Sequence, residues 1–144
     1  PIIRLQEEIE HLTSFIEIQR HRFGDNLDVQ INDIQDLGHF GVPFFAIQTL
    51  VENAFKHGIE RNETSHQIRI SCVKDGENLR VDVEDDGPGF AVEAAQSAGV
   101  GLSNVRKRLV VLYGDEASVE TGKSSLKGAK VSLIWPARTP EDEV

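Results

Sequence analysis

Apolar residues recur near the beginning of the chain with the spacing of an amphipathic helix. They lie three or four positions apart, at Leu5, Ile9, Leu12 and Ile16. Polar residues fill the opposite face, so the stretch from Leu5 to about Arg22 predicts a helix, and Gly24 is suited to end it. The pattern then changes to alternation from Leu27 to Ile31, which predicts a half-buried strand.

The rest of the chain predicts two further helices and four further strands. In chain order these are a helix from Pro43 to His57, strands over Ile68–Cys72 and Leu79–Val83, a helix over Leu102–Leu112, and strands over Ala117–Thr121 and Ala129–Trp135. A Pro at the start and Gly58 after the end favour the first of these helices. The polar, glycine-containing segment between Cys72 and Leu79 predicts a hairpin that makes its two strands neighbours.

Composition limits the size and the partners of the protein. The 144 residues suit one domain, and 39% hydrophobic with 27% charged residues describe a globular chain. The formal net charge of −9 disfavours a nucleic-acid grip through phosphate neutralisation and disfavours contact with an anionic membrane surface. Cys72 is the single cysteine, which excludes an internal disulfide and a cysteine-rich zinc site. Because the sequence has no Met, we expect it to be a piece of a longer protein.

The negative charge is distributed unevenly along the chain. Residues 75–96 hold seven acidic residues and one Arg, whereas residues 97–136 hold six basic and three acidic residues. Any site for an anion is therefore expected in the second stretch.

The strand that ends at Asp85 carries this carboxylate on its apolar face. Side chains alternate along a strand, so Asp85 faces the same way as Val81 and Val83. A buried charge is costly unless it is hydrogen-bonded, so Asp85 should accept hydrogen bonds from fixed donors or from a ligand. Gly87 and Gly89 follow and let the backbone approach a neighbour closely. An Asp that only caps its own turn is the alternative explanation.

A glycine-rich turn precedes the helix predicted over Leu102–Leu112. Its residues are Gly99, Val100, Gly101 and Leu102. The N-terminus of a helix presents free backbone N–H groups and the positive end of the helix dipole, which together suit a phosphate group. The dinucleotide fingerprint and the GKS/T phosphate loop are both absent from the sequence. A flexible loop with a glycine helix cap is the alternative.

Three polar residues lie at the end of the helix predicted from Pro43 to His57. Asn53, Lys56 and His57 are spaced i, i+3 and i+4, which places them on one face of an α-helix. An amide oxygen is a suitable ligand for Mg²⁺, which takes phosphate oxygens among its other ligands. Alternatively, the Lys and the His only interact with the dipole at the helix C-terminus.

Together, the three motifs resemble the nucleotide-binding boxes of the GHKL ATPase superfamily. The segments are VENAFKHG from Val51, VEDDGPGF from Val83 and GVGLSNVRKRL from Gly99, in that order. Residues 5–136 resemble most closely the LytS/YesM-type sensor histidine kinases. The resemblance implies an α/β (α+β) fold of two layers, in which helices cover one face of a mixed, mostly antiparallel sheet.

For the phosphate end of a bound ATP, the resemblance implies a role for each matching residue. Asn53 would coordinate Mg²⁺ between the phosphates, with Lys56 and His57 close by. Glu52 corresponds to the residue that activates water in superfamily members that hydrolyse ATP. The glycine-rich segment would contact the phosphates through Gly99, Val100, Gly101 and Leu102.

For the adenine end, the resemblance assigns the second motif. Asp85 would accept a hydrogen bond from the adenine amino group, and Gly87 and Gly89 would shape the pocket. The stretch from Phe90 to Gly99 would form a lid over the nucleotide.

The resemblance also divides the chain into three parts. Residues 1–24 would lead in from a dimerisation domain, residues 25–137 would form the ATP-binding catalytic domain, and residues 138–144 would be a disordered acidic tail. The first helix is expected either to pack on its own domain or to continue a dimer helix.

As part of a sensor histidine kinase, the chain would present the γ-phosphoryl group of MgATP to a histidine on a separate upstream domain. The full-length protein would be a membrane-anchored bacterial homodimer that serves a response regulator, and this chain would be a cytoplasmic part of it that does not phosphorylate itself. A self-sufficient ATPase that uses Glu52 and a nucleotide-gated interaction module are the alternatives.

Overall fold

The computed structural model describes residues 1–24, 26–32, 34–59, 67–87 and 92–143, without the side chains of residues 35, 92–100 and 142–143. Its strands are β1 Ile2–Arg4, β2 Asp28–Asn32, β3 Gly41–Pro43, β4 Gln67–Asp75, β5 Asn78–Asp85, β6 Ser118–Lys123 and β7 Ala129–Pro136. Its longer helices are α1 Leu5–Phe23, α2 Ala46–Ala54 and α3 Val92–Tyr113. Short helical turns lie at η1 Gln35–Leu37, η2 Phe55–Ile59, η3 Gly114–Glu116 and η4 Pro140–Glu143.

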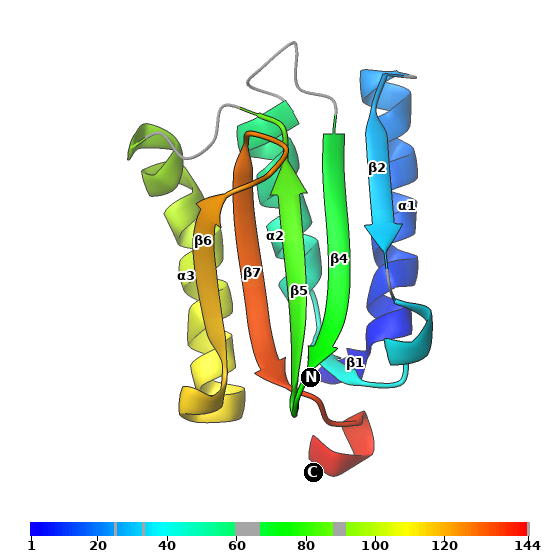
Figure 1. Ribbon diagram of the computed structural model, residues 1–144, viewed down its shortest axis with the longest axis vertical. Helices are drawn as coiled ribbons and strands as arrows, with labels where there is room; N and C mark the ends of the chain where they lie inside the picture. The colour runs from blue at the N-terminus through cyan, green and yellow to red at the C-terminus, as the bar shows by residue number, and fades with distance from the viewer. Residues whose placement is uncertain (25, 33, 60–66, 88–91, 144) are drawn as a thin grey trace.

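Five of the strands form one sheet, in the order β2-β4-β5-β7-β6. β2 runs parallel to β4, and the other neighbouring pairs are antiparallel. Figure 1 shows α1, α2 and α3 behind this sheet, so that they cover one of its two faces. The expected two-layer fold with a mixed, mostly antiparallel sheet is therefore confirmed.

The hydrophobic core lies between the sheet and the helices, and α1 is part of it. Leu5, Leu12 and Ile16 of α1 are at most 4% exposed, and Trp135 of β7 is fully buried. The Trp135 indole N–H donates to the backbone oxygen of Gly41 at 2.8 Å, so its polar atom has a partner. Of the two arrangements expected for the first helix, the structure shows packing on its own domain.

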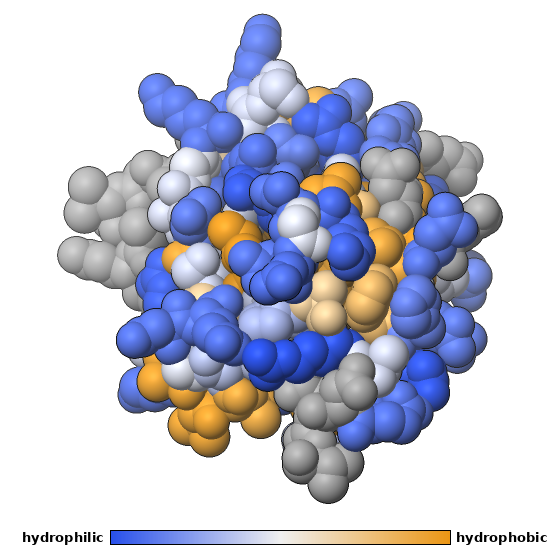
Figure 2. Space-filling view, turned by 60° about the horizontal axis from the view of Figure 1, so that its bottom comes forward, coloured by the Kyte–Doolittle hydropathy of each residue, from blue (hydrophilic) through white to orange (hydrophobic). Residues whose placement is uncertain are grey.

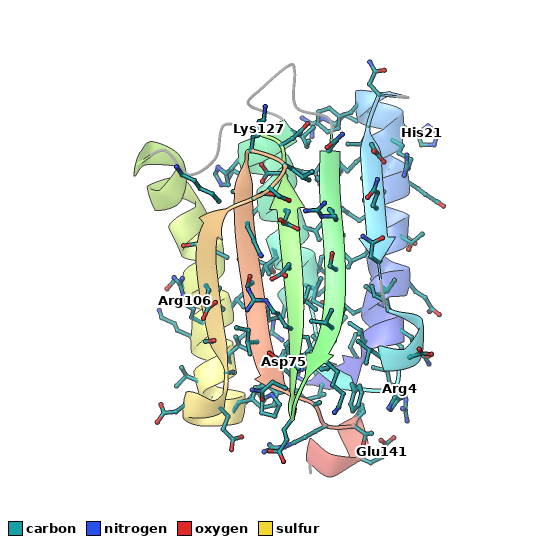
Figure 3. All side chains as sticks on the ribbon, viewed as in Figure 1. Arg4, His21, Asp75, Arg106, Lys127 and Glu141 are labelled. Carbon is teal, nitrogen blue, oxygen red and sulfur yellow. The ribbon has the colours of Figure 1, made fainter. Side chains whose placement is uncertain are left out.

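A second, two-stranded sheet joins the two ends of the chain. β1 pairs antiparallel with β3, and the backbone N–H of Gly41 donates to Arg138 O at 2.6 Å. Arg4 and Glu141 form an ion pair at 2.5 Å, and Figure 3 shows both at the same end of the molecule. The prediction of a disordered tail therefore differs from the structure over residues 138–143, because backbone and charge contacts attach this segment to β1 and β3.

The helix predicted from Pro43 to His57 is shorter than expected. Pro43 is the last residue of β3, and Phe45 then adopts a left-handed conformation with φ of 68° before α2 begins. β3 pairs on one side only, with β1, so a residue without an N–H is tolerated in it. After Ala54 the chain continues as η2, which is a π-helical turn.

Among the described residues, the exposed large apolar side chains include three consecutive residues of α3, Val110, Val111 and Leu112. Figure 2 shows a mostly hydrophilic face with apolar residues gathered in separate patches. The most exposed large apolar side chains are Val111 of α3 at 84%, Ile18 of α1 at 64% and Val110 of α3 at 62%. Within the described ranges, no helix is both long enough and apolar enough to cross a membrane.

Candidate functional site

Asp85 lies at the end of β5 with its side chain turned into the protein. The residue is 5% exposed, which confirms the alternation that placed it on the apolar face. Its Oδ1 accepts hydrogen bonds from the backbone N–H of Gly87 at 2.8 Å and of Ala129 at 3.3 Å. Burial raises the pKa of the Asp85 carboxyl, although the two backbone donors oppose this rise. An Asp that only caps its own turn would explain the bond from Gly87. It does not explain the bond from Ala129, which belongs to β7.

Gly128 brings the turn between β6 and β7 against Asp85. A Cβ on Gly128 would overlap the backbone oxygen and Oδ1 of Asp85, and it would lie 2.6 Å from Gly87 N. Figure 3 labels the preceding residue, Lys127, at the end of the molecule where β5 ends. The motifs did not identify Gly128, although a glycine directly before an alternating strand indicates a close approach of two backbones.

Glu84, next to Asp85, anchors the same turn. Its carboxylate accepts hydrogen bonds from Arg69 Nε at 3.0 Å and from Ser124 Oγ at 2.9 Å. Arg69 also donates to Ser125 Oγ at 2.7 Å. Glu84 is 6% exposed, and through its bonds to Ser124 and Arg69 this buried carboxylate holds the turn between β6 and β7 against β4 and β5.

Asn53 lies at the end of α2 and is half-buried. Its Nδ2 is buried without a hydrogen-bond partner in the part of the chain that the structure describes. A buried amide nitrogen without a partner is costly for the folded state.

The π-helical turn after α2 changes the positions of the next two polar residues. Lys56 is exposed, whereas His57 is only 8% exposed. The α-helical spacing predicted that both share one face with Asn53, whereas in the structure they lie on a π-helical turn and differ in exposure. Single π-helical turns within helices occur frequently at functional sites.

Glu52 is exposed and is oriented by the residue one turn earlier. Gln48 Nε2 donates to Glu52 Oε1 at 3.3 Å. Gln48 itself is 6% exposed, and its Oε1 is buried without a partner among the described residues. The motifs did not single out Gln48.

Gly101 of α3 lies against the Asn53 amide. A Cβ on Gly101 would lie 3.2 Å from Asn53 Nδ2, 3.3 Å from Asn53 Oδ1 and 3.5 Å from Thr49 Cγ2. Space for a small group in front of the amide therefore depends on a glycine at this position. Leu102 follows, and it is only 4% exposed, so its side chain belongs to the core.

The glycine-rich segment does not begin a helix. α3 starts at Val92, so residues 99–102 lie inside it, where backbone N–H groups bond within the helix. The prediction of a phosphate-binding helix N-terminus at Gly99 and Val100 therefore differs from the structure. Three alanines between residues 92 and 99 favour helix and extend it through the glycines. Gly89 and the first residues of the predicted lid, 90–91, lie outside the described residues.

Comparison with known proteins places this arrangement in context. Residues 43–139 match the family model for histidine kinase-, DNA gyrase B- and HSP90-like ATPases. The sensor histidine kinase BtsS of Escherichia coli K12 is 30% identical over 136 residues, which are 94% of this chain and 24% of BtsS. The sensor protein LytS of Staphylococcus haemolyticus is 28% identical over 153 residues, with 99% of this chain and 26% of LytS covered. The chain thus spans about a quarter of these relatives.

A solved structure shows the same fold. The ATP-binding domain of PrrB from Mycobacterium tuberculosis superposes with a TM-score of 0.63 at 18% identity, with 96% of this chain and 98% of that chain covered.

Proposed function

Because the chain belongs to the family of histidine kinase-, DNA gyrase B- and HSP90-like ATPases, we propose that it is the ATP-binding catalytic part of a sensor histidine kinase. The similarity to the sensor kinases BtsS and LytS supports the kinase branch of the family. The observation that carries the proposal is the buried carboxylate of Asp85, which accepts from backbone donors through Oδ1 alone among the residues that the structure describes.

Asp85 would recognise the adenine ring. In the described part of the chain, both hydrogen bonds to its carboxylate end on Oδ1, which leaves Oδ2 to accept from the adenine amino group. Gly87 and Gly128 keep the neighbouring backbone free of side chains. Gly89 would complete the pocket.

The phosphate end would bind Mg²⁺ and ATP between α2 and α3. Asn53 fits such a site because its amide is half-buried and faces the space that Gly101 leaves open. Its Nδ2, which has no hydrogen-bond partner among the described residues, is a donor and would face a phosphate oxygen rather than the metal. Asn53 would supply an amide oxygen to Mg²⁺, which neutralises phosphate charge when bound. Lys56 is exposed and would reach a phosphate with its ammonium group, whereas the buried His57 would support the end of α2 from behind. Contact of Gly99, Val100 and Gly101 with phosphates would require that the first turns of α3 unwind.

The catalytic work of this chain would be to position the nucleotide. It would hold the γ-phosphoryl group where a histidine of an upstream domain of the same kinase attacks it, and a response regulator would then accept the phosphoryl group. The full-length protein would be a membrane-anchored homodimer.

Discrimination between ADP and GDP in the presence of Mg²⁺ tests the proposal. Adenine presents an amino donor where guanine presents a carbonyl acceptor, so a carboxylate should bind the first and repel the second. We expect calorimetry to show MgADP binding that exceeds MgGDP binding by at least about a hundredfold. Equal binding of the two nucleotides, or of neither, would contradict the proposal.

A self-sufficient ATPase is the second candidate, and the exposed, oriented carboxylate of Glu52 favours it. Steady-state phosphate release that disappears in Glu52→Gln, while MgADP binding persists, would support it. Glu10→Gln is a suitable control because Glu10 is exposed on α1. Phosphate release that is absent in the wild-type chain supports the kinase assignment.

A further inference from the structure

We propose that Glu8 is a positioning residue that joins α1 to the beginning of α2 and thereby sets where α2 presents Glu52 and Asn53. The inference rests on the proposed function, because it concerns how the nucleotide site is held in place.

Glu8 caps α2 from another helix. Its Oε1 accepts a hydrogen bond from the backbone N–H of Phe45 at 3.1 Å, and its Oε2 accepts from Ile47 at 3.0 Å and from Gln48 at 3.3 Å. The first N–H groups of a helix have no partner within the helix, and a carboxylate there also meets the positive end of the helix dipole. Phe45, at the cap position, has a left-handed backbone and makes no side-chain cap bond of its own. The cap therefore comes from about forty residues earlier in the chain.

The position of Glu8 on α1 is a core position. It is 1% exposed and shares the buried stripe of α1 with Leu5, Leu12 and Ile16. Within the described ranges, no basic side chain forms an ion pair with it. A buried carboxylate destabilises the fold relative to a leucine unless it accepts hydrogen bonds. We therefore infer that Glu8 is present because the three backbone N–H groups need its carboxylate as their acceptor.

The same contact extends to the site through Gln48. The Gln48 backbone N–H donates to Glu8, and its side chain donates to Glu52 Oε1. Asn53 follows Glu52 directly. α2 has only 9 residues, so a shift of its first turn also shifts its last turn, where both residues lie. The position of α1 is thereby coupled to the position of the phosphate end of the site.

The adenine end is independent of this coupling. Asp85 ends β5, Gly87 follows it, and Gly128 precedes β7, so none of them belongs to α2. Loss of the Glu8 contact should therefore weaken the part of nucleotide binding that depends on Mg²⁺ and leave the remaining part unchanged. A residue that only stabilises the fold would weaken both parts equally.

The experiment measures ADP affinity by calorimetry with Mg²⁺ and in EDTA, for the full chain. The ratio of the two affinities is the Mg²⁺-dependent gain. In Glu8→Gln, the amide group replaces one acceptor by a donor that faces the α2 N–H groups, so we expect the gain to fall on the order of tenfold. The affinity in EDTA should not change. Glu10→Gln, on the exposed face of the same helix, should match the wild type in both conditions.

Two further variants keep the result decisive. Glu8→Asp retains the charge but withdraws it by one methylene, so it should lower the gain less than Glu8→Gln, and it serves if Glu8→Gln does not fold. An unchanged gain in both Glu8 variants, or an equal loss in both conditions, would overturn the inference. Asp85→Asn should lose affinity in both conditions, and if it binds like the wild type, the proposed function fails instead.

Discussion

On the sheet side of the site, Asp85 and Glu84 have their carboxylates held by backbone and side-chain donors. On the helix side, Asn53 Nδ2 and Gln48 Oε1 are buried without partners in the part of the chain that the structure describes. The sheet side takes its shape from hydrogen bonds that form on folding. The two polar atoms on the helix side gain no hydrogen bond from the described residues when the chain folds. Changes that break the hydrogen bonds or move the turn on the sheet side should therefore affect both stability and binding, whereas changes on the helix side should affect binding alone.

The largest effect is expected from Asp85→Asn. Oδ1 of the amide still accepts from Gly87 and Ala129, but an amino group replaces Oδ2 and opposes the amino group of adenine. MgADP affinity should fall by about a hundredfold. The free energy of unfolding should stay within about 1 kcal/mol of the wild type, since the buried charge is lost but both backbone bonds persist.

Calorimetry and urea unfolding measure these two quantities, and Asp75→Asn, at an exposed Asp that ends β4, is the control. A large loss of stability together with unchanged binding would mean that Asp85 is only a turn cap.

Gly128→Ala should lower stability on the sheet side. The added Cβ overlaps Asp85 and approaches Gly87 N, so the turn must move, at a cost of about 1 to 3 kcal/mol in the free energy of unfolding. MgADP affinity should fall as the turn shifts. Gly122→Ala in the adjacent β6 is a matched control, because a Cβ there meets nothing within 4 Å. Equal stability of the two variants in urea unfolding would show that the turn does not press on Asp85.

Gly101→Ala should separate binding from stability on the helix side. Ala favours an α-helix over Gly by about 1 kcal/mol, which offsets the close contact of the new Cβ with Asn53. We expect an unchanged unfolding midpoint and a decrease of MgADP affinity of about fivefold to tenfold, because the methyl group fills the space before the amide. Thermal unfolding and calorimetry on the same sample measure both. A stability loss as large as that of Gly128→Ala would remove the distinction between the two sides.

The smallest effect is a pH dependence of stability that arises from Asp85. Burial raises its pKa above the 3.8 of an ordinary Asp, so the folded state retains this proton to a higher pH than the unfolded chain. The contribution of Asp85 to stability is therefore complete below about pH 4 and decreases as the pH rises through the folded-state pKa. The contribution is measured as the difference in the free energy of unfolding between the wild type and Asp85→Asn from pH 4 to pH 7. The contributions of the other carboxyl groups cancel in this difference.

The wild type should lose stability relative to Asp85→Asn with rising pH. A difference that does not vary with pH would show that Asp85 titrates normally. Glu8, whose pKa burial also raises, contributes equally to both proteins.

Local periodicity predicted the elements whose structure is decided locally. Alternation along β5 predicted that Asp85 faces inward, and the three-four spacing predicted α1. β1 and β3 have three residues each, too few to show a pattern, and they exist because they pair with each other. The start of α3 was predicted at Leu102 because Gly99 and Gly101 were interpreted as a turn before the helix. The alanines before them favour helix, and α3 begins at Val92.

The residues that sequence reasoning missed in the site act over long distances. Glu8 lies in the apolar stripe of α1, and the sequence pattern did not single it out, since its partners lie about forty residues away. Gly128 touches Asp85 across the sheet. Neither contact can be predicted from a repeating pattern of apolar and polar residues, because the two partners lie far apart in the sequence.

The pairing of Arg4 with Glu141, described above, has a practical consequence for experiments. Both ends of the described chain lie together at the end of the molecule opposite the end of β5, where Asp85 is found (Figures 1 and 3). A sensor chip or a fluorophore attached through either terminus would therefore be far from the proposed nucleotide site, which would face the solution. Loss of the ion pair would in turn be read by a pair of dyes on the two termini as an increase in their separation.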